Sequence, residues 1–226
     1  MRRAFTLIEL LVVVAIIALL ISILLPSLGR AKMRTRIVRA HADLRQITIA
    51  LDAYAMNHRD RLPPTRCACG VNVNFQLPVE LARERFLAKS RSNIPQADMR
   101  DEFDRENTYK YRAPGPIYQN GTFFDSPTKP WKPRATIWVP DDFPLCASER
   151  GRLYANLTGE PPSPVAYAVW SIGPNRRSPK FALVEGTDTV DESKFPMRRA
   201  YWLQHSGDTG LIAHIRGSNG MTYMSP

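Results

Sequence analysis

The sequence predicts an α+β fold in which a long N-terminal helix packs on a C-terminal antiparallel sheet. Residues 10–25 are apolar throughout except for Ser22, and the apolar positions after residue 36 recur at gaps of three and four. Both patterns are typical of helices. Short β-branched and aromatic runs separated by turn residues come later in the chain, and they indicate strands.

The composition fits one moderate domain plus a separate apolar element. Hydrophobic residues make up 44% of the 226 residues but are unevenly spread, and 19 prolines predict a loop-rich remainder. The net charge is +10, and residues 1–61 hold ten basic against four acidic residues. A basic belt just after the apolar run suits anionic lipid head groups, could attract nucleic acid, or is a solvated helix face.

The apolar run is long enough to cross a membrane. About twenty helical residues span the roughly 30 Å hydrocarbon core, and residues 5–28 exceed this length with no charged residue after Glu9. A carboxylate at the edge of such a run costs on the order of a few kcal/mol to insert. Glu9 therefore either reaches the head-group region or pairs with a cation brought by another subunit.

The N-terminal features stand in the reverse order of an ordinary secretory signal, because basic residues and a small residue precede the apolar run. The residues from Ala4 to Leu11, read as AFTLIELL, resemble the class III signal of type IV pilins and type II secretion pseudopilins. In that family a prepilin peptidase cuts before the Phe and methylates the new amine. The resemblance implies cleavage between Ala4 and Phe5 and N-methylation of Phe5. Ala4 departs from the Gly usual in the family, so slower cleavage is expected.

The resemblance also implies an assembly role. Glu9 becomes the fifth residue of the processed chain and would neutralise the Phe5 amine of a neighbouring subunit. Pro26 matches the family's helix-kinking proline; it should kink or locally open the helix, and Gly29 adds flexibility nearby. The expected organisation is a prepilin leader at 1–4, a transmembrane and assembly helix at 5–28, an amphipathic stem helix at 29–60 and a globular α+β head at 61–226.

Six apolar residues of the stem form one stripe: Ile37, Ala40, Leu44, Ile47, Leu51 and Tyr54. We expect this stripe to pack on the chain's own sheet and the helix to end before Pro63 and Pro64. A short helix is expected at 81–90, and a helical turn or edge segment at 103–111. Strands are expected at 136–139, 165–171, 181–185, 200–204, 211–215 and 221–224.

Residues 166–175 resemble a strand and turn of the G-like pseudopilins, in which an acidic loop follows and binds calcium. Here Asn175 stands near the expected acid and two arginines follow it. Three acidic residues further along lack a recognisable loop spacing: Asp188, Asp191 and Glu192. Because calcium prefers several oxygen ligands, usually carboxylates, we expect neither calcium nor another cofactor.

Three cysteines are too few for a disulfide scaffold. Cys67 and Cys69 are only two positions apart, so outside the cytoplasm we expect one of them to pair with Cys146 and the other to stay free. His41 and His58 are the nearest additional metal ligands, but their helical positions favour packing or surface roles and no zinc spacing is present. We therefore expect no metal site.

The sequence predicts a structural subunit, a pseudopilin or minor pilin, of a type II secretion-like or type IV pilus-like envelope filament. It would cross the bacterial inner membrane once, with its head outside the cytoplasm, and be extracted into the filament. Expected partners are other pilin subunits, prepilin peptidase, the inner-membrane assembly platform and membrane lipid. The motif does not choose between secretion, adhesion, motility and DNA uptake.

Two alternatives to a structural subunit are a DNA-binding module and a membrane-anchored enzyme. A pilin-anchored DNA-binding module is suggested by two tryptophans and four arginines that could grip single strands: Trp170, Trp202, Arg176, Arg177, Arg198 and Arg199. Residues 62–226 hold 21 basic against 17 acidic residues, a small excess that favours scattered solubilising charge. An anchored enzyme is not expected, because no nucleophile triad, Walker loop or HExxH motif is present. The remaining histidines, His205 and His214, are expected in core or surface roles.

Overall fold

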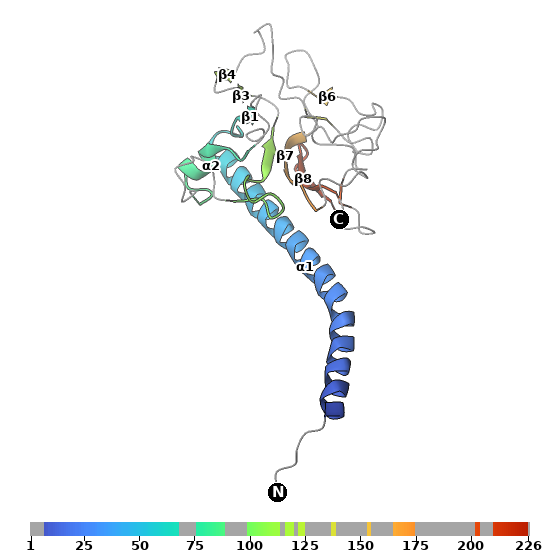
Figure 1. Cartoon of the computed structure of the whole chain (residues 1–226). Helices are drawn as coiled ribbons and strands as arrows, with labels where there is room; N and C mark the ends of the chain where they lie inside the picture. The colour runs from blue at the N-terminus through green and yellow to red at the C-terminus, as the bar shows by residue number, and fades with distance from the viewer. Residues whose placement is uncertain are drawn as a thin grey trace. The chain divides into compact units, whose positions relative to one another are not determined.

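The computed structural model describes residues 7–67, 76–88, 99–113, 116–119, 122–124, 137–138, 153–154, 165–174, 202–203 and 210–225. The chain divides into two compact parts, Met1–Arg36 and Ile37–Pro226, which we call the N-terminal part and the globular part. Helix α1 (Leu7–Asn57) contributes to both (Figure 1). The fold is α+β, with a long apolar N-terminal helix and a C-terminal antiparallel sheet, as predicted.

Within the globular part, one face of α1 is buried. The buried positions include all six residues of the predicted stripe, together with Thr48 and Ala50. Leu44, Ile47 and Leu51 are fully covered. The helix ends at Asn57, before Pro63 and Pro64 as expected, because the following Arg59 and Asp60 adopt left-handed backbone angles with φ of 56° and 60°.

The main sheet holds four antiparallel strands in the order β2 (Lys110–Arg112), β7 (Val165–Ser171), β8 (Ile212–Gly217) and β9 (Thr222–Met224). Strand β7 has the bounds predicted from the sequence, and β8 and β9 overlap the strands expected at 211–215 and 221–224. The two longest strands pair in the register Val169 with His214 and Trp170 with Ala213, and they lie side by side in Figure 1.

The two faces of the sheet carry different side chains because alternate residues of a strand point to opposite faces. One face turns toward α1: the Tyr167 hydroxyl contacts Asp52 of the helix, and His214 contacts His41. The other face holds Ala168, Trp170, Ala213 and Ile215, all fully buried. The sheet is therefore covered on both faces, and its α1 face is where the stem attaches.

Several short elements were not expected or were misplaced. Helix α2 (Val79–Arg83) begins two residues before the helix expected at 81–90 and is shorter, because Arg85 has a φ of 67°. Of the two alternatives for 103–111, the edge segment is confirmed for the last two residues, which belong to β2 at the edge of the main sheet, while residues 103–109 form bends and turns rather than a helix. A small sheet unites β1 (Thr65–Cys67), β3 (Ile117–Gln119) and β4 (Thr122–Phe124). Another joins β5 (Ile137–Trp138), within the strand expected at 136–139, to β6 (Leu153–Tyr154).

Two expected strands lie largely outside the described residues. The segment 181–185 is not among them, and of 200–204 only residues 202 and 203 are described. Trp202 forms a parallel bridge to Leu211, so this segment adjoins the start of β8. Between β1 and α2, the Arg66 guanidinium lies 2.6 Å from Glu80 Oε1 and 4.4 Å from the centre of the Tyr118 ring, which links the small sheet to α2.

Candidate membrane-anchoring and assembly segment

The first turns of α1 expose an unbroken apolar surface. Leu7 is 79% exposed and Leu28 65% exposed, and the large apolar residues between them are exposed as well. Patches of this extent are rare on soluble proteins and mark membrane or protein contacts. Among the described residues, α1 is the one helix long and apolar enough to cross a membrane. Its N-terminal part therefore fits a membrane anchor.

The polar side chains inside this apolar stretch are satisfied locally. Ser22 Oγ donates to the Leu19 carbonyl at 2.7 Å, and Ser27 Oγ donates to the Leu24 carbonyl at 2.8 Å. A hydroxyl bonded to its own helix backbone presents no unsatisfied group to lipid. The two serines are thus compatible with the apolar surroundings that the helix requires.

Pro26 and Gly29 lie within α1, which continues through both residues. Pro26 has no N–H to donate to the preceding turn, and a methyl group added at Gly29 would meet nothing within 4 Å. The kink or local opening predicted at these positions stays a prediction.

Glu9 lies in the first turn of α1. A negative charge at this end of a helix interacts favourably with the helix dipole. The residues before Leu7 lie outside the described part of the chain, so the cleavage expected between Ala4 and Phe5, the methylation of Phe5 and the assembly role of Glu9 stay predictions.

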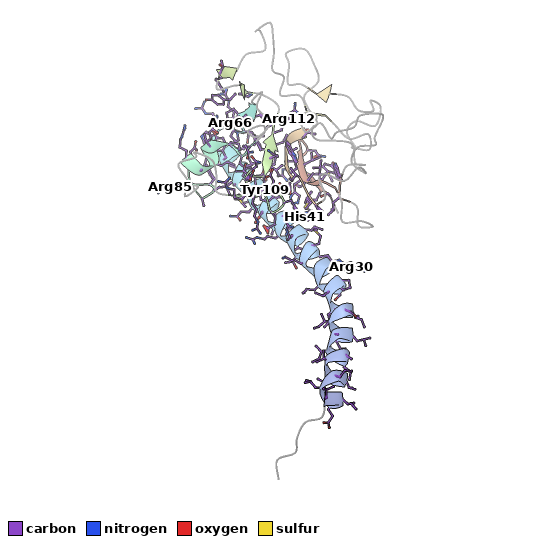
Figure 2. The ribbon with its side chains drawn as sticks, viewed as in Figure 1. Arg30, His41, Arg66, Arg85, Tyr109 and Arg112 are labelled. Atoms are coloured by element: carbon purple, nitrogen blue, oxygen red, sulfur yellow. The ribbon has the colours of Figure 1, made fainter. Side chains whose placement is uncertain are left out.

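In the globular part, two tyrosines of the sheet region bind acidic residues of α1. The Tyr109 hydroxyl donates to Asp43 Oδ2 at 2.8 Å, and the Tyr167 hydroxyl donates to Asp52 Oδ1 at 2.8 Å. Figure 2 labels Tyr109 beside α1. Burial raises the pKa of both hydroxyls, and the carboxylate partner raises each further. Asp52 also lies 3.4 Å from the Arg216 guanidinium, so acids on the helix fix it to the sheet.

A histidine pair provides a third attachment. His41 Nδ1 of α1 lies 3.2 Å from His214 Nε2 of β8, and only 2% of His214 is exposed. Burial, together with the charges of His41 and Arg45, lowers the pKa of His214 to about 4. A hydrogen bond between two imidazoles needs one donor and one acceptor nitrogen, so at least one of the two rings is neutral, and the lowered pKa assigns the neutral form to His214 at pH 7. The sequence left packing or surface roles open for His41 and core or surface roles open for His214, and it did not indicate their pairing, because they are 173 positions apart.

Asp101 is one of the buried polar residues that the sequence did not single out. It is fully covered, and its carboxylate accepts hydrogen bonds from Ser171 Oγ at 2.6 Å, Phe103 N at 2.9 Å and Ile172 N at 2.9 Å. Burial raises the pKa of the Asp101 carboxyl, and these three donors oppose the rise. These bonds connect the turn before β2 to the end of β7, and they engage the Ser171 hydroxyl. The role of Asp101 is therefore structural.

Other predicted site residues are only partly described. Cys69 and Cys146 lie outside the described residues, and of Cys67 only the backbone in β1 is described, so the disulfide stays a prediction. The residues weighed for calcium, from Asn175 to Glu192, also lie outside. No group of three metal-binding side chains occurs in the portion that the structure describes.

The tryptophans proposed to stack on single-stranded DNA are buried: Trp170 is 0% and Trp202 6% exposed. A base can stack only on an accessible ring, so neither residue can serve in that role in this fold. The four arginines named with them lie outside the described residues.

A comparison with known families identifies the N-terminal signal. The model of the prokaryotic N-terminal methylation motif matches residues 1–25. The match indicates a type IV pilin-like substrate of prepilin peptidase and favours a structural subunit that assembles with other pilin subunits over an enzyme. No curated protein and no solved structure matches the chain.

Proposed function

We propose that the chain is a pseudopilin or minor pilin: a structural subunit of a type II secretion-like or type IV pilus-like envelope filament. The observation that carries this proposal is the combination of the methylation motif at residues 1–25 with an exposed apolar helix that continues into a packed globular part. The apolar helix anchors the unassembled subunit in the inner membrane, and the same surface packs against other subunits in the filament.

Processing would create the charge that assembly uses. Cleavage between Ala4 and Phe5 leaves the amine of Phe5, and Glu9 then stands four residues further along the chain. A carboxylate in an apolar bundle is costly to bury, and a cation of a neighbouring subunit close to it lowers that cost. Glu9 of one subunit therefore selects the processed amine of its neighbour.

The direct test is incorporation of Glu9→Gln into filaments. We expect this variant to be cleaved normally, with an N-terminus that starts at Phe5, but to be lost from sheared or cross-linked filament fractions. Glu9→Asp is the matched control and should keep partial incorporation, because it retains the charge. Equal incorporation of Glu9→Gln and the native chain would contradict the assembly role. A native N-terminus that still begins at Met1, in cells with active prepilin peptidase, would contradict the function itself.

Orientation is a separate test, because the charges flanking the span favour the opposite arrangement. Arg2 and Arg3 precede the apolar run, whereas six basic residues follow it: Arg30, Lys32, Arg34, Arg36, Arg39 and Arg45. Basic residues near a span tend to stay cytoplasmic. The proposal instead requires the globular part to be exported, so trypsin added to spheroplasts should degrade it. Protection until the membrane is permeabilised would contradict the proposed location.

A further inference from the structure

The segment that follows the apolar surface carries a group of basic side chains in the N-terminal part of α1. Arg30, Lys32 and Arg34 are all exposed, and Arg30 projects from the helix in Figure 2. None of the three forms an ion pair within the described part of the chain. The sequence offers no local compensation, because no acidic residue occurs between Glu9 and Asp43.

The three basic residues, which we call the basic collar, do not share one face of the helix. A helix turns about 100° per residue, so Lys32 points about 200° away from Arg30, while Arg34 returns to within about 40° of Arg30. A protein partner that docks on one side would leave the charge on the opposite side unmatched. A layer of charges that surrounds the helix matches both sides.

The position of the basic collar along the helix also places it at the level of the lipid head groups. At about 1.5 Å per residue, Arg30 lies roughly 35 Å from Leu7, slightly more than the roughly 30 Å thickness of the hydrocarbon core. If the N-terminal end of α1 lies at one membrane surface, the basic collar falls in the head-group region of the other. Gly29, just before the first cation, and Ala31, between the first two, are small, and space around Gly29 is open, so head groups can approach the helix closely.

We propose that the basic collar is a docking surface for anionic phospholipid head groups. The inference rests on the proposed membrane anchoring and adds the lipid class that the anchored subunit selects. Arginine and lysine near the surface attract anionic lipid, and arginine can bind a phosphate with two parallel hydrogen bonds. The segment has no aromatic residue to stack on bases, which argues against nucleic acid as the source of the phosphate.

The test measures lipid selectivity around the intact chain. The full-length protein is reconstituted in phosphatidylcholine vesicles that contain trace spin-labelled phosphatidylglycerol or spin-labelled phosphatidylcholine. We expect the motionally restricted lipid to be enriched in phosphatidylglycerol by roughly two- to fivefold at low salt, and the preference to fall toward one in 0.5 M salt because the charges are exposed and screened.

Three variants assign the effect to the basic collar. Arg30→Gln, Lys32→Gln and Arg34→Gln together should abolish the preference, whereas Arg30→Lys with Arg34→Lys should keep most of it. The matched control removes three exposed charges from the globular part, Arg61→Gln, Arg83→Gln and Arg85→Gln, and should leave the preference unchanged. A preference that survives the collar triple variant, or that the control triple variant also removes, would overturn the proposal.

The same measurements separate this proposal from the function it rests on. If neither labelled lipid is restricted and alkaline carbonate extracts the chain, membrane anchoring itself fails. If both lipids are restricted equally, the span is inserted and only the lipid selectivity is refuted. If the collar triple variant keeps its lipid preference but is lost from filaments, the charges serve a second copy of the chain, and the lipid assignment is wrong.

Discussion

The two halves of α1 have the same secondary structure but different partners. Residues 10–28 are apolar around the whole helix apart from Ser22 and Ser27 and are exposed, whereas residues 37–54 bury one stripe against the chain's own sheet. A helix that is apolar on all sides must find its surroundings outside the chain, whereas a striped helix can be satisfied within it. The first half is therefore built for lipid or other subunits, and the second half holds the globular part.

The largest expected effect comes from truncating one leucine in each half of α1 and comparing the losses of stability. Leu44→Ala removes a fully covered side chain and should lower the unfolding free energy of the globular part by about 2–5 kcal/mol. Leu24→Ala, at a position 62% exposed, should leave it unchanged. Tryptophan fluorescence during denaturation of the full chain in detergent measures both, because all four tryptophans follow residue 36. Equal losses would contradict the division of the helix.

The histidine pair makes the attachment of the stem to the sheet depend on pH. The pKa of His214 is lowered from 6.5 to about 4 in the folded chain, so the unfolded chain binds the proton more readily. The stability that neutral, buried His214 contributes to the folded chain is complete above pH 6.5 and is lost as the pH falls to about 4. It amounts to at most about 3 kcal/mol.

The measurement compares native protein with His214→Gln between pH 7 and pH 4. The native unfolding free energy should fall more steeply as the pH is lowered, because the variant lacks the buried imidazole. His41 and Arg45, the groups that face His214, stay in place in both proteins. Parallel pH profiles would show that His214 does not titrate with folding.

Asp101 tests a polar contact that does not involve the helix. Asp101→Asn keeps the volume but turns an NH₂ group toward at least one of three donors. A buried donor left without an acceptor costs about 1–3 kcal/mol, so the midpoint of denaturation should shift accordingly. Asp60→Asn, at an exposed position after α1, is the control and should have no measurable effect. An unchanged midpoint for Asp101→Asn would mean that the donors find other acceptors.

The sequence predicted the features that depend on periodicity. The stripe from Ile37 to Tyr54 and the bounds of β7 followed from spacing and residue type, and the structure confirms both. The apolar helix was predicted from composition, because an apolar run of that length suits a membrane-spanning helix, and the structure places the run within α1.

The features that the sequence did not predict depend on distant partners or on very short elements. Strands β1, β3 and β4 have three residues each, too few for an alternating pattern to develop. Asp101 looked like one acid among many in a charged segment, and its importance arises only when β7 presents Ser171 and Ile172 to it. His41 and His214 likewise become a pair only after the helix docks on the sheet.

The smallest predicted effect concerns a single hydroxyl between helix and sheet. Tyr109→Phe removes the hydrogen bond to Asp43 but leaves the ring, so we expect a loss of about 1 kcal/mol in the unfolding free energy. Asp43→Ala removes the acceptor and should have a similar effect and, because the two groups form one contact, the double variant should lose less than the sum of the single losses. Additive losses would show that the hydroxyl and the carboxylate act independently. Both substitutions lie outside the apolar residues 7–28, so the same variants should not change insertion into vesicles.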